Sequence, residues 1–356
     1  MSNRTACTYH GSFGSGARVL TSTYDELNRL ATISEGATLV ARYDYKGPAR
    51  VERRRLGATP TLTCTTSYDL LPRPIVLDHQ TSAATVARFE YGYDRAHHRL
   101  FEKRVHDANQ GEVYNYDSIY RVVREERNVD LTSVAAGTRI APETYRTNDW
   151  QSLAFDGVQN RTATIDTVAS TSTTTSWARR ASTNQYASRQ VGSAAAELFT
   201  WDANGNLTGD GAKRYAYDFK NRLVEVRDRT TSAVLVRYSY DAMDRRAFKV
   251  VDPLGTTPTT THYIYDGSRI LEERDQGGTL LKSHVWGAAP DELLQVQRGS
   301  AATATYWVAE NSLGNIAALV DDSGTTVERY AYDAYGKTTV TLNGNTGNEY
   351  RFQTTR

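Results

Sequence analysis

The chain has 356 residues, with 42 basic and 41 acidic side chains and a formal net charge of +1. This balance argues against a nucleic-acid partner, which needs a clustered basic face, and no apolar run is long enough to span a membrane. Two cysteines, Cys7 and Cys64, are too few for a disulfide framework and lack metal-ligand spacing.

Residues 1–20 are predicted to form an irregular lead-in. No apolar run follows the first residues, so we predict no secretory signal. The glycine-rich stretch 11–16 lacks the Lys-Ser or Lys-Thr pair and the strand–helix context of a phosphate-binding loop. An irregular segment is therefore the favoured interpretation.

A Tyr-x-Tyr-Asp signature recurs through residues 21–340 in about a dozen degenerate copies. Tyr91 and Tyr114 are 23 residues apart, and so are Tyr215 and Tyr238. A period of this length indicates a solenoid, a propeller or a linear array. The residues to which we assign a structural role as the repeat signature are Tyr24, Asp25, Tyr91, Asp94, Tyr114, Asp117, Trp201, Asp202, Gly205, Tyr215, Asp218, Arg222, Tyr238, Asp241, Tyr263, Asp266, Tyr330, Asp333 and Gly336.

The signature has a physical interpretation as one β-hairpin. Two aromatic residues at positions i and i+2 face the same side of a strand. The aspartate then ends the strand and starts a turn, and an Asn or Gly about three residues later can adopt positive φ. An Arg-Leu pair begins the return strand. One hairpin is marginal in water but stacked hairpins share a buried face, so the sequence predicts an all-β fold of repeated antiparallel hairpins.

Residues 162–196 are rich in Thr, Ser and Ala and allow two interpretations. They could form a flexible linker or a degenerate stretch of the array. Trp177 and Tyr186 stand where the aromatic residues of a sheet are expected, and linkers are more often rich in Gly and Pro. The degenerate repeat is favoured.

Each signature aspartate has a basic neighbour, as in Asp218 with Arg222 and Asp241 with Arg245. An acid–base site is one hypothesis, and a turn carboxylate with a solvated ion pair is the other. Catalysis needs one constellation, whereas this pair recurs along the chain, so the structural interpretation is favoured. The adjacent carboxylates Asp291-Glu292 point to opposite faces if they lie on a strand, and Asp321-Asp322 do the same.

The histidines show no zinc-binding spacing, and His97 and His98 are expected to be solvated in a turn. We therefore predict no metal, no cofactor and no catalytic residue. A sheet face lined with tyrosine could bind sugars or peptides by stacking, although cross-strand packing of the rings is favoured.

Two runs resemble the RHS or YD-repeat proteins of bacteria, which are related to teneurin repeats and insecticidal toxin-complex shells. They are residues 201–211 with the following Tyr217-Asp218 and 221–223, and residues 311–321 leading to 330–336. Residues 348–352 resemble the start of the next family segment. The resemblance implies a curved or spiral sheet that forms a hollow shell, and a secreted or cell-surface location.

In full-length family members the shell encloses a variable C-terminal toxin, which an aspartate-based motif frees by self-cleavage. The chain stops at Arg356, so residues 341–356 are expected to be the start of a truncated core-associated segment, without the motif or the toxin. Asp252-Pro253-Leu254-Gly255 resembles the cleavage tetrapeptide, but an ordinary turn is the favoured interpretation.

The sequence therefore predicts a non-catalytic structural or interaction module, a fragment of an RHS-type shell. Two alternatives are a glycan- or protein-binding surface module and the shell part of a toxin whose catalytic domain is missing. The expected partners are a toxin domain, other shell segments or a cell-surface glycan or protein. We also expect self-association through open sheet edges.

Overall fold

A computed structural model of the protein describes residues 5–9, 18–59, 61–299, 304–344 and 346–351. These residues form thirty β-strands and one short 3-10 helix, η1 (Pro142–Thr144). The predicted all-β fold is confirmed. No helix of the described residues is long and apolar enough to cross a membrane.

The strands form two antiparallel meanders of 16 and 14 strands, in which every strand pairs with its neighbours in the chain. The first sheet contains β1 (Ala6–Tyr9), β2 (Arg18–Tyr24), β3 (Leu30–Glu35), β4 (Thr38–Lys46), β5 (Arg50–Leu56), β6 (Leu62–Tyr68), β7 (Pro74–Gln80), β8 (Thr85–Tyr93), β9 (Arg99–Arg104), β10 (Gln110–Tyr116), β11 (Val122–Asp130), β12 (Trp150–Phe155), β13 (Arg161–Val168), β14 (Thr171–Arg179), β15 (Tyr186–Val191) and β16 (Glu197–Leu198). The second contains β17 (Thr200–Trp201), β18 (Leu207–Gly209), β19 (Lys213–Tyr217), β20 (Leu223–Asp228), β21 (Val234–Tyr240), β22 (Arg246–Val251), β23 (Thr259–Asp266), β24 (Arg269–Arg274), β25 (Leu280–Trp286), β26 (Leu293–Arg298), β27 (Ala304–Glu310), β28 (Ile316–Asp321), β29 (Thr326–Tyr332) and β30 (Thr338–Leu342).

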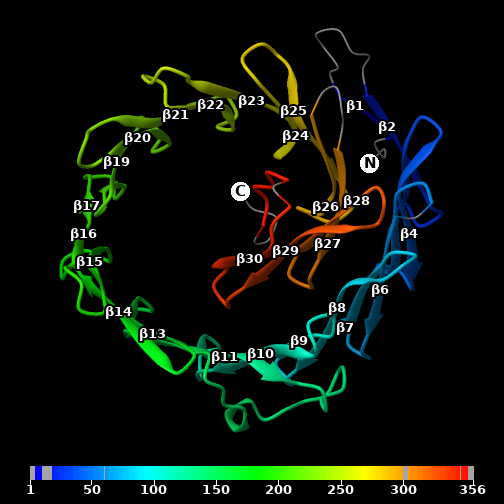
Figure 1. The fold of residues 1–356 in the computed structure, drawn as a ribbon, viewed down its shortest axis with the longest axis horizontal. Helices are drawn as coiled ribbons and strands as arrows, with labels where there is room; N and C mark the ends of the chain where they lie inside the picture. Colours follow the sequence, from blue (N-terminus) through cyan, green and yellow to red (C-terminus); the bar gives the residue numbers. More distant parts are fainter. Residues whose placement is uncertain (1–4, 10–17, 60, 300–303, 345, 352–356) are drawn as a thin grey trace.

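The strands follow one another around a ring (Figure 1). After β25 the chain turns inward, so that β26–β30 lie inside the ring beside β4–β11. We call β4–β11 the wall, β26–β30 the inner strands and β14–β22 the arc. The predicted curved or spiral hairpin sheet is thus present, with one part of the ring doubled by the end of the array.

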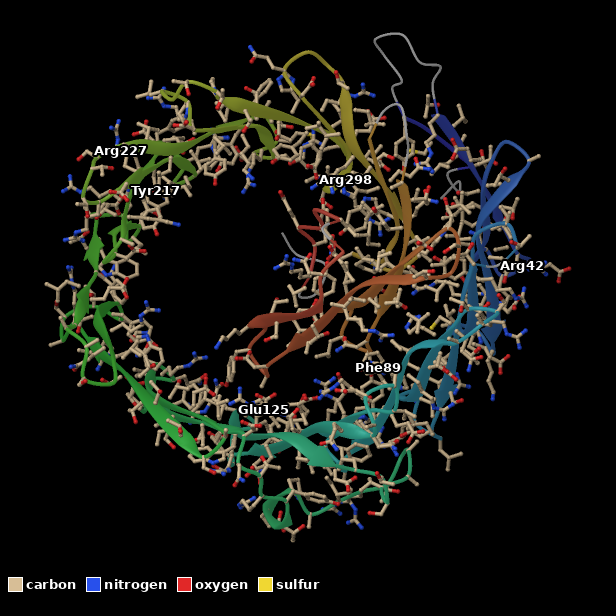
Figure 2. The ribbon with its side chains drawn as sticks, in the orientation of Figure 1. Arg42, Phe89, Glu125, Tyr217, Arg227 and Arg298 are labelled. Atoms are coloured by element: carbon tan, nitrogen blue, oxygen red, sulfur yellow. The ribbon has the colours of Figure 1, made fainter. Side chains whose placement is uncertain are left out.

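The largest hydrophobic core lies between the wall and the inner strands. It includes Val40, Leu56 and Phe89 from the wall and Leu294 and Trp307 from the inner strands. Because alternate residues of a strand face opposite sides, the wall directs one set of side chains toward the inner strands and the other set outward. Figure 2 shows Phe89 between the two layers, whereas the exposed Arg42 points out of the ring.

A second core covers the outer side of the wall, where the loop between β11 and β12 folds back. Leu131 and Val134 of this loop pack with Phe101 and Val113 of the wall. A Cβ atom on Gly92 would lie 2.2 Å from the carbonyl oxygen of Thr138, so only glycine allows this approach.

The arc is a single layer. Of the residues from 171 to 225, only Gly209 is buried. Residues 162–196 lie in the strands β13–β15 and in the segments around them, and both Trp177 and Tyr186 are strand residues. The interpretation of this stretch as degenerate repeat rather than linker is confirmed.

The two ends of the array differ from regular hairpins. Residues 6–9, within the predicted irregular lead-in, form β1 and pair with β2, while the glycine-rich residues 11–16 lie outside the described residues. Residues 346–351 pack beside the inner strands: the backbone N–H of Thr346 donates to Glu328 and the backbone N–H of Ile316 to the carbonyl of Arg351. The division into lead-in, array and tail at residues 20 and 340 stays a prediction.

Candidate functional site

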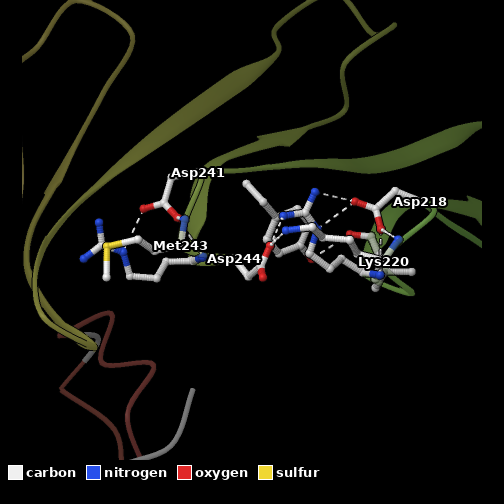
Figure 3. Close-up of polar contacts among 9 residues, drawn as sticks. Asp218, Lys220, Asp241, Met243 and Asp244 are labelled. Carbon is white, nitrogen blue, oxygen red and sulfur yellow. Dashed lines mark hydrogen bonds and ion pairs between the residues drawn. The ribbon is translucent and has the colours of Figure 1, made fainter.

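The repeated turn is the feature in which the signature residues meet. In the β19–β20 turn, Asp218 Oδ1 accepts the backbone N–H groups of Lys220 at 2.9 Å and Arg222 at 3.0 Å. Asp218 Oδ2 accepts Arg222 Nε at 2.7 Å (Figure 3). Asp241 does the same with Met243 and Arg245 at 2.8, 2.9 and 2.7 Å. One carboxylate thus holds the whole turn.

The backbone of these turns repeats as well. The third residue after the aspartate has positive φ, for example 60° at Asn221 and 89° at Gly205. The sequence predicts Asn or Gly at this position, but other residues occupy it as well. Tyr120 and Asp244 stand there with φ of 71° and 63°. The bonds to the aspartate hold these residues in the left-handed region that few side chains favour.

A second set of contacts joins each hairpin to the one before it. The last aromatic residue of a signature donates its hydroxyl or indole N–H to a backbone carbonyl of the preceding hairpin. The distances are 2.6–2.9 Å, and the pairs are Tyr45–Leu30, Tyr68–Val51, Tyr93–Pro74, Tyr116–Arg99, Trp201–Tyr186, Tyr217–Leu207, Tyr240–Leu223, Tyr265–Arg246, Trp286–Ile270 and Tyr332–Ile316. The Trp201 contact bridges the two sheets.

The turn arginine reaches forward to the next hairpin. Arg245 Nη1 donates to the carbonyl of Gly267 at 2.7 Å, and its guanidinium lies 4.8 Å from the ring centre of Tyr265. Arg222 stacks on Tyr240 at 4.7 Å and also contacts Asp244 at 2.6 Å (Figure 3). We call this chain of aspartate, arginine and aromatic contacts the turn ladder.

The structure places the signature residues in separate turns rather than in one shared pocket. The first tyrosines of the signatures differ in how far they are buried. Tyr91, Tyr114, Tyr263 and Tyr330 are buried, whereas Tyr215 and Tyr238 are half-buried. Asp25 and Asp117 follow the same turn geometry and bind the arginines four residues later, Asp333 accepts the N–H groups of Tyr335 and Lys337, and Gly336 has a φ of 86°. Asp266 differs from the prediction, because it lies in β23, pairs with Arg269 and is followed directly by Gly267 with a φ of 57°.

The turn carboxylates are held in their charged form. Hydrogen bonds from the side chain and the backbone of Arg29 lower the pKa of Asp25. Backbone and side-chain hydrogen bonds from Arg121 act in the same direction on the pKa of Asp117, although burial opposes them. A general acid needs the opposite shift, so this geometry suits a turn cap.

Three predicted features have different outcomes. The prediction that His98 is solvated is wrong, because its Nδ1 lies 2.8 Å from Asp94 Oδ2 and its ring stacks on Tyr120. His97 is an exposed turn residue with a φ of 71°.

Asp252–Gly255 forms the predicted turn between β22 and β23. The backbone N–H of Gly255 donates to the carbonyl of Asp252 at 3.0 Å.

Sequence reasoning missed a buried cluster of charges between the wall and the inner strands. Arg54 of β5 contacts the carboxylate of Glu292, and its Nη1 lies 3.6 Å from Glu310 Oε2. Tyr43 donates its hydroxyl to Glu292 Oε2 at 3.1 Å. Arg54 and Leu56 share one strand face, which hints at burial, but the sequence does not signal contact over more than 230 residues.

Two clefts adjoin this cluster. One, of about 630 Å³, is lined by aromatic rings that include Tyr24, Tyr45 and Trp286. The other, of about 560 Å³, is lined by Arg54 and Glu310, and Glu292 borders both. Among the described residues, no group of three or more His, Cys, Asp or Glu side chains is placed to hold a metal ion.

The Teneurin YD-shell family model matches residues 171–347. Two curated relatives are the tRNA3(Ser)-specific nuclease WapA of Bacillus spizizenii, 29% identical over 205 residues, and the tRNA nuclease WapA of Bacillus subtilis, 31% identical over 147 residues. These alignments cover 57% and 41% of this chain. The chain spans only 8% and 6% of the length of these relatives.

Solved structures of toxin complexes share the fold. A crystal structure of TcdB2-TccC3-Cdc42 has a TM-score of 0.66 at 14% identity and covers 96% of this chain. A structure of the Photorhabdus luminescens Tc holotoxin pore has a TM-score of 0.62 at 13% identity and covers 95%. In each case the match spans 19% of the other chain. The sequence resemblance to shell-forming repeat proteins is thereby confirmed.

Proposed function

Since residues 171–347 match the Teneurin YD-shell family model and the fold is shared with toxin-complex structures, we propose that the chain forms part of a wall around a toxin domain. The observation that carries this proposal is the inward path of the array's end. The inner strands and residues 346–351 lie inside the ring (Figure 1), so a polypeptide joined after them starts from the enclosed side. The nuclease names of the two WapA relatives support a toxin as this polypeptide.

The hydrogen bonds and ion pairs of the turn ladder support a structural role for the chain. Its donors and acceptors are used within and between hairpins, and the same contacts recur from β2 to β30. We propose that the chain carries no catalytic site of its own, binds no nucleic acid and needs no cofactor. A secreted or cell-surface location is part of the same proposal.

Protease protection of a C-terminal fusion tests the proposal. A short tagged peptide with one protease site is fused after the last residue, and the same peptide is fused before the first residue as the matched control. The cleavage rate of the C-terminal peptide is expected to be severalfold lower, because the ring shields it. Equal cleavage rates in the two fusions would contradict a role in enclosure.

The cleft lined by Tyr24, Tyr45 and Trp286 favours a second candidate, a glycan-binding surface module. Half-buried aromatic rings next to charged groups in a cleft suit a sugar, since the rings can stack on it and the polar groups can orient it. A glycan array with the intact protein and with Tyr24→Ala tests it, with Tyr215→Ala in the arc as the control. Binding lost only in Tyr24→Ala supports this candidate, and absence of any bound glycan excludes it.

A further inference from the structure

The charged cluster between the wall and the inner strands joins parts of the chain that are far apart in the sequence. Arg54 comes from β5, Glu292 directly precedes β26, and Glu310 ends β27. Arg54 and Glu310 are 7% and 8% exposed. His79 of β7 contacts the backbone carbonyl of Glu310 at 2.7 Å through Nε2. We call Arg54, Glu292 and Glu310 the seam cluster.

The seam cluster contains one guanidinium and two carboxyl groups. Arg54 contacts Glu292 closely and lies farther from Glu310, at 3.6 Å. Glu310 Oε1 is buried and has no hydrogen-bond partner among the described residues. A second negative charge at this place would be desolvated and only partly compensated, which is strongly unfavourable. A neutral Glu310 removes this penalty.

We propose that the seam cluster is a proton-operated latch, which holds the inner strands on the wall while Glu310 is protonated and loosens when Glu310 ionises. The latch depends on the buried contact between the two layers and applies whether or not anything is enclosed. It therefore goes beyond the proposed shell function and can fail without affecting it.

The titration of Glu310 fixes the direction of the effect. Burial raises the pKa of Glu310 from 4.5 to about 8, and the nearby Arg54 offsets only part of this rise. In the opened seam the carboxyl regains its ordinary pKa, so the closed state binds more protons. The stabilisation is complete below pH 4.5 and is lost as the pH rises through 8. Between these values the opening equilibrium rises about tenfold per pH unit for one proton.

His79, Cys64, Tyr43 and Arg54, which lie near Glu310, titrate outside this window. Burial lowers the pKa of His79 to about 3 and raises the pKa of Cys64 to about 11. Burial also raises the pKa of Tyr43 well above its ordinary value, while Arg54 stays charged because its pKa is raised by the glutamates against burial. Glu125 of β11 has a pKa raised to about 8 as well, so the part of a transition between pH 5 and 8 that is lost in Glu310→Gln is the part that belongs to Glu310.

Cys64 is a natural probe of the seam. It pairs directly with Arg54 across β5 and β6, is buried and lines the cleft beside the cluster. In a Cys7→Ser background it is the only thiol. The rate of its reaction with 4,4′-dithiodipyridine is measured from pH 5 to 9 and divided by the rate of a free thiol at the same pH. This ratio gives the opening equilibrium when the rate is proportional to the reagent concentration.

The ratio is expected to rise about tenfold per pH unit between pH 5 and 8 and to level off above 8. Glu310→Gln, which is neutral at every pH, is expected to lose the tenfold rise per pH unit that the Glu310 proton contributes. Glu26→Gln, at an exposed turn, is the matched control and keeps the rise. A flat profile in the Cys7→Ser protein would overturn the latch without the need for any glutamate variant, and so would an unchanged rise in Glu310→Gln.

Discussion

The doubled wall and the single-layered arc use the same hairpin in different surroundings. In the wall, the first tyrosine of the signature points into the core against the inner strands, and Tyr91 is 0% exposed. In the arc, Tyr215 and Tyr238 occupy the same position and are half-buried. Burial of the first tyrosine therefore depends on a second layer and not on the repeat itself.

The last aromatic residue of the signature behaves alike in both regions. Tyr93 of the wall donates to the carbonyl of Pro74 at 2.9 Å, and Tyr240 of the arc donates to the carbonyl of Leu223 at 2.7 Å. This contact lies within the sheet and needs no second layer. The turn ladder is therefore present in both regions, whereas the core between two layers is present only where the inner strands cover the wall.

The largest expected difference between the regions concerns the first tyrosine. Tyr91→Ala removes a buried ring and the hydroxyl that accepts the backbone N–H of Ser312 at 3.0 Å, so the free energy of unfolding is expected to fall by about 3–5 kcal/mol. Tyr238→Ala in the arc is expected to lower it by roughly 1 kcal/mol. Urea unfolding followed by tryptophan fluorescence measures both, and equal losses would break the comparison.

The next effect is a pH dependence of stability between pH 4.5 and 8 in the doubled region. Figure 2 shows Glu125 on the side of β11 that faces the inner strands, and it is 0% exposed. Burial first, and then the charge of Glu112, raise the pKa of Glu125 from 4.5 to about 8. Its contribution to stability is complete below pH 4.5 and is lost as the pH rises through 8.

Within that window, Glu125 is expected to lower the free energy of unfolding by about 1.4 kcal/mol per pH unit. Glu125→Gln is expected to remove this part of the slope in urea unfolding between pH 5 and 8. Glu225→Gln is the matched arc control, since Arg227 and Arg237 bind Glu225 and its pKa is lowered although burial opposes the shift. A slope of unchanged size in Glu125→Gln contradicts the assignment, whereas the smaller slope that Glu310 contributes is expected to remain.

A smaller effect is expected to be equal in the two regions. Tyr93→Phe and Tyr240→Phe each delete one hydroxyl that donates to a backbone carbonyl. Each is expected to lower the free energy of unfolding by about 1 kcal/mol. The same denaturation measurement applies, and a loss confined to the wall would show that the hydroxyl contact contributes nothing to stability in the arc.

The smallest effect is local. Asp218→Ala removes the acceptor of the Lys220 and Arg222 backbone N–H groups, so hydrogen exchange of these two amides is expected to become faster. Asp218→Asn keeps an acceptor, as Asn311 does for Leu313 and Asn315, and should exchange nearly as the wild type. Faster exchange of equal size in both variants would mean that the charge, and not the acceptor, holds the turn.

The sequence was sufficient for features that are local to one hairpin. The alternation in Tyr-x-Tyr-Asp, the turn at the aspartate and the glycine or asparagine with positive φ all follow from a few neighbouring residues. The doubled layer could not be predicted in this way, because the packing of Leu56 against residues near Leu294 depends on the curvature summed over many hairpins. The contact between Arg54 and Glu310 could not be predicted for the same reason. Nor could the burial of Glu125 beneath the β29–β30 turn.

The forward reach of the turn arginine has an evolutionary consequence. Each arc hairpin is fastened only to the units directly before and after it, as Arg222 and Tyr240 show. Duplication or loss of one complete 23-residue unit therefore regenerates the same contacts at the new junction. Such an event alters the circumference of the ring by two strand spacings, about 10 Å, so the size of the ring is set by the number of repeat copies in the gene.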